Sequence, residues 1–133
     1  MSDLFQDANT DGTPFPGAEK FNGDLSKWDV LDVISMQSMF QFASSFNADL
    51  SKWDVSSVII MAGMFKQATS FNADLSKWDV SSVTNMAKMF KGASSFARTL
   101  CGAWFISTAN KEAMFEGSRG RVCRKNQTPT LTD

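Results

Sequence analysis

The chain repeats one pattern of apolar and polar positions every 25 residues. The segment FNADLSKWDVSSV occurs at residues 46–58 and again at residues 71–83, and a looser copy begins at Phe21. Residues 46–70 and 71–95 differ at only five of their 25 positions. A fixed repeat of this length is typical of proteins whose units bury their apolar sides against one another.

Each repeat divides into two parts with different periodicity. In residues 71–76 apolar side chains alternate with polar ones, which predicts a short strand. From Val80 to Ala93 the apolar residues recur at steps of three and four, which predicts an α-helix of about three turns. We therefore expect an α/β solenoid with one strand and one helix in each 25-residue repeat, the strands forming a parallel sheet.

The repeat also sets the expected organisation of the chain. Its 133 residues suffice for one domain. Residues 1–20 would form an N-terminal cap or extension, and residues 119–133 a basic C-terminal tail. The solenoid would occupy residues 21–118, with three good repeats (21–45, 46–70 and 71–95) and one degenerate repeat (96–118).

Stacking of the repeats would align equivalent side chains in rows. Rows of phenylalanine and of methionine are expected in the core. The row of Trp28, Trp53 and Trp78 has two interpretations, a core row or an exposed row that contacts a partner or stacks on sugar rings. Rows of aspartate would repel one another, so either the lysine of each repeat or calcium would neutralise them.

The differences between repeats indicate a second candidate surface. Its residues, which would lie outside the core stripe of the first two predicted helices, are Leu31, Ile34, Ile59, Ile60 and Gly63. The third repeat carries mostly polar residues at the matching positions. Gly63 in mid-helix would leave room for a partner's backbone, and an exposed apolar patch usually marks an interaction surface. The alternative is that a terminal segment, such as residues 13–20, covers this patch.

The composition argues against catalysis and against nucleic-acid binding. The chain has no histidine, which is the commonest general base and metal ligand. The carboxylates are identical in each repeat, so they provide no asymmetry that separates an acid from a base. We therefore expect no enzyme, no catalytic residue and no cofactor. The net charge of −1 and the lack of a basic stripe predict no nucleic-acid partner.

An acidic loop near the N-terminus is a weak candidate for calcium binding. Asp7, Asn9 and Asp11 match the first three ligand positions of an EF-hand loop, but Ala18 stands at the twelfth position, where a glutamate is required. We therefore expect an acidic turn and no metal. No apolar run approaches the roughly 20 residues of a membrane span, so we expect no transmembrane segment and leave peripheral membrane association open.

Cys101 and Cys123 are the only cysteines. They lie 22 residues apart, close to one repeat, so stacking would bring them side by side. A disulfide there would close the end of the solenoid, whereas the alternative is two free thiols. A disulfide favours an oxidising compartment.

The unit F-N-x-D-L-S-x-W-D-V-S-S-V-x-x-M-x-x-M-F-x-x-A-x-S resembles the repeat of BspA-like leucine-rich-repeat surface proteins. The resemblance is strong over residues 21–95 and weak over residues 96–118. It implies a short leucine-rich-repeat-like solenoid that serves as a non-catalytic adhesion or binding module, in contact with a protein or a glycan. It also implies a location at the cell surface or outside the cell.

Two departures from this family open an alternative. Members often have many more repeats and a lipobox or wall anchor, and we find neither in this chain, nor a leader peptide. We therefore expect either a fragment of a longer surface protein or a structural accessory subunit. The subunit would dock in a larger, membrane-associated assembly through the apolar outer face of the first two helices. Its location would be another oxidising or organellar compartment.

Overall fold

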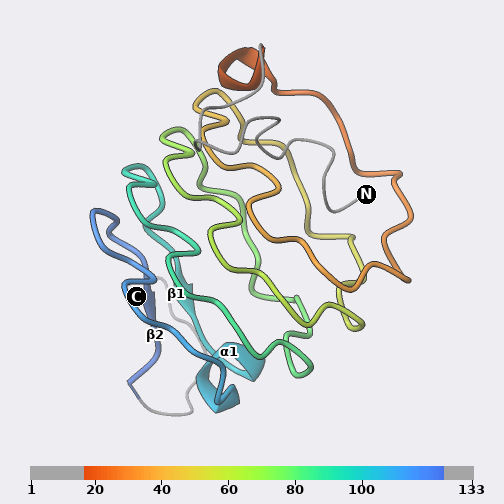
Figure 1. The fold of residues 1–133 in the computed structure, drawn as a ribbon, viewed down its shortest axis with the longest axis vertical. Helices are drawn as coiled ribbons and strands as arrows, with labels where there is room; N and C mark the ends of the chain where they lie inside the picture. The colour runs from red at the N-terminus through yellow and green to blue at the C-terminus, as the bar shows by residue number, and fades with distance from the viewer. Residues whose placement is uncertain (1–16, 125–133) are drawn as a thin grey trace.

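The computed structural model describes residues 17–124 and arranges them as coils that run side by side (Figure 1). The regular elements of these residues are the 3-10 helix η1 (Ala18–Lys20), strand β1 (Thr99–Leu100), helix α1 (Ala103–Ile106) and strand β2 (Arg121–Val122). β1 and β2 pair in parallel, with Thr99 opposite Arg121. The prediction of an α/β solenoid with one strand and one helix per repeat is therefore wrong. Residues 21–95 contain no helix and no strand, only isolated bridges.

Backbone hydrogen bonds between neighbouring 25-residue segments take the place of the expected helices. In the second segment, the N–H groups of alternate residues donate to carbonyls of the third at 2.7–2.9 Å; the donors are Met61, Gly63, Phe65 and Gln67, and the acceptors Asn85, Ala87, Met89 and Lys91. The same bonds recur from Met36 onward and from Met86 onward. Parallel bridges join Ser35, Ile60, Asn85 and Asn110 in the same direction. We call each segment a coil and this set of bonds the lateral ladder.

Positive φ angles at a fixed place in each coil prevent an α-helix. Ser38, Gly63 and Lys88 occupy equivalent positions, with φ of 56°, 64° and 59°. A left-handed residue cannot continue a right-handed helix, because its N–H and carbonyl turn away from the helix axis. The backbone instead makes turns three residues long, such as the 3.1 Å bond from the Met89 N–H to the Met86 carbonyl. The apolar steps of three that suggested a helix come from these successive turns.

Stacked aromatic rows fill the core between the walls of the coils. Phe40, Phe65, Phe90 and Phe115 stack with centroids 5.5–5.6 Å apart. Phe21, Phe46, Phe71 and Phe96 form a second row with centroids 5.8–6.0 Å apart. Methionines line the same interior: Met61 and Met86 are both fully buried, and their N–H groups make equivalent lateral bonds. The phenylalanine and methionine rows expected in the core are therefore there.

The tryptophan indoles tie adjacent coils together. Nε1 of Trp53 donates to the Leu25 carbonyl of the preceding coil at 2.9 Å, and Nε1 of Trp78 donates to Leu50 at 2.9 Å. Trp104 stands one position later than the repeat would place it, within the single turn of α1. Its Nε1 still reaches the Leu75 carbonyl, at 3.1 Å. The short helix therefore absorbs the shift and keeps the indole in its row.

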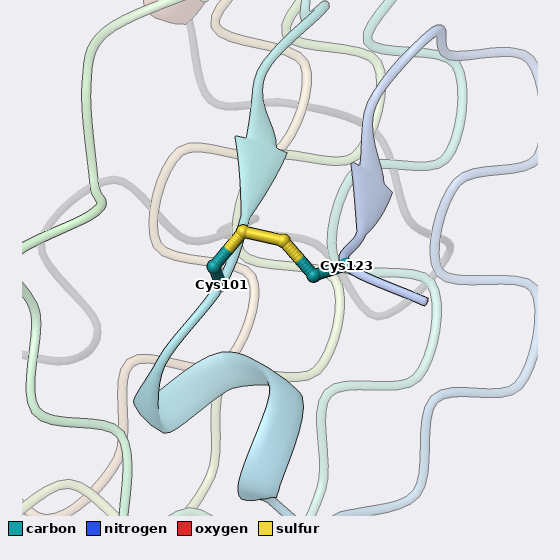
Figure 2. Close-up of a disulfide and its surroundings, with 2 residues drawn as sticks. All are labelled: Cys101 and Cys123. Carbon is teal, nitrogen blue, oxygen red and sulfur yellow. A yellow bond between two sulfur atoms is a disulfide. The ribbon is translucent and has the colours of Figure 1, made fainter. Parts of the chain in front are cut away.

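A disulfide closes the C-terminal end of the stack. Cys101 follows β1, Cys123 follows β2, and the two sulfur atoms are bonded between the parallel strands above α1 (Figure 2). Their Cα atoms are 5.0 Å apart, and both residues are buried. The predicted pairing of Cys101 with Cys123 is confirmed.

The left-handed positions give a test that separates this fold from a helix. Because Lys88 has φ of 59°, Lys88→Gly should be more stable than Lys88→Ala by about 1 kcal/mol. A helix would reverse the order, since glycine is about 1 kcal/mol worse than alanine in a helix interior. Gly63→Ala should likewise destabilise the protein by about 1 kcal/mol. Urea denaturation of the three variants measures these differences, and equal stability of the two Lys88 variants would contradict the assignment.

The disulfide should carry a large share of the stability. It closes a loop between cysteines 22 residues apart, so its loss should lower the free energy of unfolding by about 3 kcal/mol. Denaturation of the wild-type chain with and without a reductant measures this term without changing any side chain. Cys101→Ala with Cys123→Ala should be insensitive to the reductant. An unchanged denaturation midpoint after complete reduction would disprove this contribution.

Candidate functional site

Three aliphatic side chains project from the surface at the N-terminal half of the stack. Leu31, Ile34 and Ile59 are 47%, 53% and 39% exposed. Ile34 and Ile59 occupy equivalent positions of adjacent coils, and the Ile59 N–H donates to the Ile34 carbonyl at 2.7 Å. Leu31 lies at the start of the turn that leads to Ile34. These three residues, which we call the apolar patch, are exposed as the differences between repeats predicted.

The apolar patch ends at the third coil. Thr84 stands beside Ile59, to whose carbonyl its N–H donates at 2.8 Å, and Ser81 stands where the first coil has Leu31. Both polar residues are exposed. The backbone is the same in the three coils, so the apolar character of the patch reflects only the choice of side chain. It therefore does not serve the packing of the coil.

Two residues assigned to this surface from the helical pattern do not belong to it. Ile60 is partly buried in the parallel bridges with Ser35 and Asn85. Gly63 is buried, and a Cβ there would lie 3.4 Å from the side chains of Ser38 and Gln41. The prediction that Gly63 leaves room for a partner is wrong, because the glycine serves the left-handed backbone and faces the neighbouring coil.

The tryptophan row is part of the core. Trp53 and Trp78 are 4% and 2% exposed, and Trp28 is partly buried against the core cluster. Their indole planes face one another, with the Trp53 and Trp78 centroids 6.5 Å apart. The predicted exposed aromatic row is therefore wrong for Trp53 and Trp78, because the hydrogen bond from each Nε1 draws the ring inward.

Each aspartate of the two rows stands before a turn of its coil and accepts a hydrogen bond from the backbone N–H two residues on. Oδ1 of Asp49 accepts the Ser51 N–H at 2.8 Å, and Oδ1 of Asp54 accepts both the N–H and the hydroxyl of Ser56, at 3.0 and 2.6 Å. These bonds hold the pKa of each carboxyl below its usual value, since they stabilise the charged form. Lys52 lowers the pKa of Asp49 further, while Asp24 raises it.

The serines that donate hydrogen bonds to the carboxylates, and so stabilise their charged form, are the residues that the sequence reasoning missed. Asp79 pairs with Ser81 as Asp54 does with Ser56, and hydrogen bonds from Ser81 lower its pKa. The sequence signal was the recurring D-x-S, since an aspartate side chain readily bonds the backbone two residues on. The lysines expected in this role contribute only secondarily.

An asparagine row joins the coils on a different wall from the lateral ladder. Oδ1 of Asn22 accepts the Asn47 N–H at 2.8 Å, and Oδ1 of Asn47 accepts the Asn72 N–H at 2.7 Å. Oδ1 of Asn72 in turn accepts the Ala97 N–H at 3.0 Å. The amide oxygens therefore serve the structure of this wall.

A polar hollow of about 420 Å³ lies along the asparagine row. Its lining consists of Asn47, Asp49, Ser51, Asn72, Ala73, Asp74, Lys77 and Arg98. Nε of Arg98 donates to the Asn72 carbonyl at 3.0 Å, and the charge of Arg98 contributes to a lowered pKa of Asp74 after the hydrogen bonds from Ser76. The hollow holds charges of both signs in adjacent positions and is open to solvent.

The structure tests only part of the metal and membrane predictions. Asp7, Asn9 and Asp11 lie outside the described residues. Within residues 17–124, no three acidic or cysteine side chains come together in a way that could hold a metal ion. Among the same residues, no helix has the length and apolar character that crossing a bilayer requires. The buried disulfide is compatible with an oxidising environment.

The aspartate turns predict a stability that depends on acid. Their pKa values are lower in the folded chain than the ordinary value of 3.8, so they stabilise the fold above that pH and lose this contribution as the pH falls below it. Asp54→Asn with Asp79→Asn keeps an oxygen for each turn but cannot titrate. The thermal midpoint should therefore fall less between about pH 5 and pH 2.5 than in the wild type. Parallel pH curves for the two proteins would show that these turns do not contribute.

Comparison with known proteins assigns this chain to a family. Comparison with curated proteins and comparison with solved structures each found no match. A family described as "Mycoplasma protein of unknown function, DUF285" matches residues 1–126, which is most of the 133 residues and includes all of the coils. The chain therefore belongs to the DUF285 family.

Proposed function

We propose that this protein is a non-catalytic binding module that contacts a partner protein through the apolar patch of Leu31, Ile34 and Ile59. The observation that carries the proposal is the exposure of three large aliphatic side chains on neighbouring coils, at positions where the third coil is polar. Burial of such side chains against a partner is favourable by about 25 cal/mol for each Å² removed from water. The patch is therefore suited to a protein contact.

The regularity of the backbone supports this interpretation of the patch. Thr84 makes the same backbone bond as its apolar counterpart, since its N–H donates to the preceding coil. A polar residue is thus tolerated at that position, and the coil does not need isoleucine in order to fold. Leu31 and Ile34 in the first coil and Ile59 in the second serve something outside the coil.

The setting that we propose is a surface or secreted repeat protein. Support comes from the resemblance of the repeat to BspA-like surface proteins and from the buried disulfide, which suits an oxidising compartment. The alternative is an accessory subunit that is docked permanently, by the same apolar patch, in a larger assembly at a membrane. The two settings differ in whether the contact is reversible, and both assign the same three side chains to it.

A protein partner is favoured over a glycan. Sugar rings bind well on exposed aromatic faces, and the indoles of Trp53 and Trp78 are buried. The polar hollow offers hydrogen-bonding groups such as Asp49 and Lys77, but it offers no aromatic platform within its lining. We therefore place the contact on the apolar patch.

The patch can be tested by giving it the residues that the third coil carries at equivalent positions. Leu31→Ser, Ile34→Thr and Ile59→Thr give the first two coils the side chains of the third, so the fold should be preserved. Without its partner, the wild-type chain should associate with itself as its concentration rises, and this variant should remain monomeric. Sedimentation velocity measures the association, and the melting temperature reports the fold.

The reverse exchange provides the matched control. Ser81→Leu with Thr84→Ile extends the apolar patch onto the third coil and should strengthen the association. If the wild type and the extended variant are both monomeric at the highest attainable concentration, the patch is not an interaction surface. An unfolded first variant would instead show that these side chains serve the coil.

A further inference from the structure

The lateral ladder ends on a row of N–H groups that have no partner among the described residues. In the third coil, the four alternate donors bond carbonyls of the fourth at 2.7–2.9 Å; these donors are Met86, Lys88, Phe90 and Gly92. The equivalent N–H groups of the fourth coil belong to Lys111, Ala113, Phe115 and Gly117. None of them donates a hydrogen bond within residues 17–124. We call these four residues the open edge.

The open edge keeps the geometry that accepts a neighbouring chain. Ala113 has φ of 53° and Gly117 has φ of 78°, close to the 59° of Lys88 and the 73° of Gly92. At these two positions the fourth coil therefore holds the same left-handed backbone conformation as the coil before it. An ordered row of unpaired N–H groups is a template for an extended segment that supplies carbonyls at alternate residues.

The side chains around the open edge indicate the chemistry of its occupant. Phe115 stacks on Phe90 through one face, with centroids 5.5 Å apart, and is partly buried, whereas Phe65 and Phe90 are fully buried between two rings. Among residues 17–124, no further phenylalanine ring continues the row beyond Phe115. Glu112 and Glu116 are exposed beside it, and in the third coil Lys91 lies 4.0 Å from Glu116. The edge therefore suits a segment with an aromatic residue followed by a basic one.

The opposite end of the stack differs. Phe40, which begins the row that Phe115 ends among the described residues, is fully buried, so its ring offers no open face to the Phe115 ring of another molecule. Head-to-tail stacking of two copies would require such a face. The asymmetry favours a segment from a different protein over a second copy of this chain.

We propose that the open edge binds an extended segment of a second protein, aligned parallel to residues 111–117, with an aromatic side chain over Phe115 and a lysine or arginine over Glu116. The segment takes the place that each coil takes on the coil before it. Its carbonyls accept the four N–H groups, and its ring continues the phenylalanine row. This contact is independent of the apolar patch, which lies on the first two coils.

The chain contains a sequence that can serve as the probe. Residues 84–93, TNMAKMFKGA, hold the carbonyls that accept the ladder bonds of the second coil, and they carry Phe90 followed by Lys91. A synthetic peptide of this sequence is added to the full chain, and amide hydrogen exchange is followed by NMR. The amides of the open edge should exchange fast in the free chain and slow on the order of tenfold with the peptide. Those of Met86, Lys88, Phe90 and Gly92 should be slow throughout and serve as the internal control.

Two further controls make the result specific. A peptide with the same residues in reverse order places a methionine, not a lysine, after the phenylalanine and should therefore give much weaker protection. Glu116→Lys should weaken binding of the forward peptide without changing the melting temperature by more than a surface substitution does, since its side chain is exposed.

Four results would overturn the proposal. The open-edge amides could already be slow in the dilute free chain, which would mean that another part of the chain covers them. They could become slow as the chain is concentrated without peptide, which would identify the occupant as a second copy. They could also stay fast at saturating peptide, or be protected equally by the reversed peptide, which would exclude recognition of this kind.

Discussion

The structure depends on the lateral ladder, in which alternate N–H groups of one coil bond the carbonyls of the next. A coil has few backbone bonds of its own beyond the three-residue turns, so its polar backbone is satisfied only when a neighbour lies in register. Register in turn requires that every coil has the same length, which explains why the good repeats keep 25 residues while their exposed side chains change. The aromatic rows follow from the same constraint, since equivalent rings lie one coil apart and can stack face to face.

The ladder also requires left-handed residues, and these explain why the sequence pattern was misread. A step of three apolar residues is produced both by a helix and by successive three-residue turns, so periodicity alone does not distinguish them. The distinguishing signal lay in the comparison of repeats: glycine occurs at Gly63 where its counterpart is Lys88, and at Gly92 where its counterpart is Gln67. Glycine that moves between two fixed positions is typical of a backbone with positive φ, and all four residues have it.

The candidate site could be predicted to the extent that it depends on the differences between repeats. The exposure of Leu31, Ile34 and Ile59 followed from the polar residues at matching places in the third repeat, and this comparison does not depend on the local backbone. Ile60 and Gly63 were assigned to the surface from the geometry of a helix. Because no helix forms there, both assignments are wrong. The tryptophans were misjudged because a long-range bond decides their position: the Leu25 carbonyl that draws in the Trp53 indole lies 28 residues away.

The coils share largely the same buried residues, so a specific contact with a partner can arise at two kinds of place. Exposed positions that make only backbone bonds can change freely, as Ile59 and Thr84 do, because neither side chain is needed to keep the ladder in register. The ends of the stack are the other place, since only there does the ladder meet something other than another coil. At the C-terminal end, β1, β2 and the disulfide fix one wall of the last coil, while the wall that carries Phe115 keeps its donors. The disulfide therefore fixes one wall of the fourth coil independently of the wall that carries Phe115, which is the physical condition for an edge that can receive a partner.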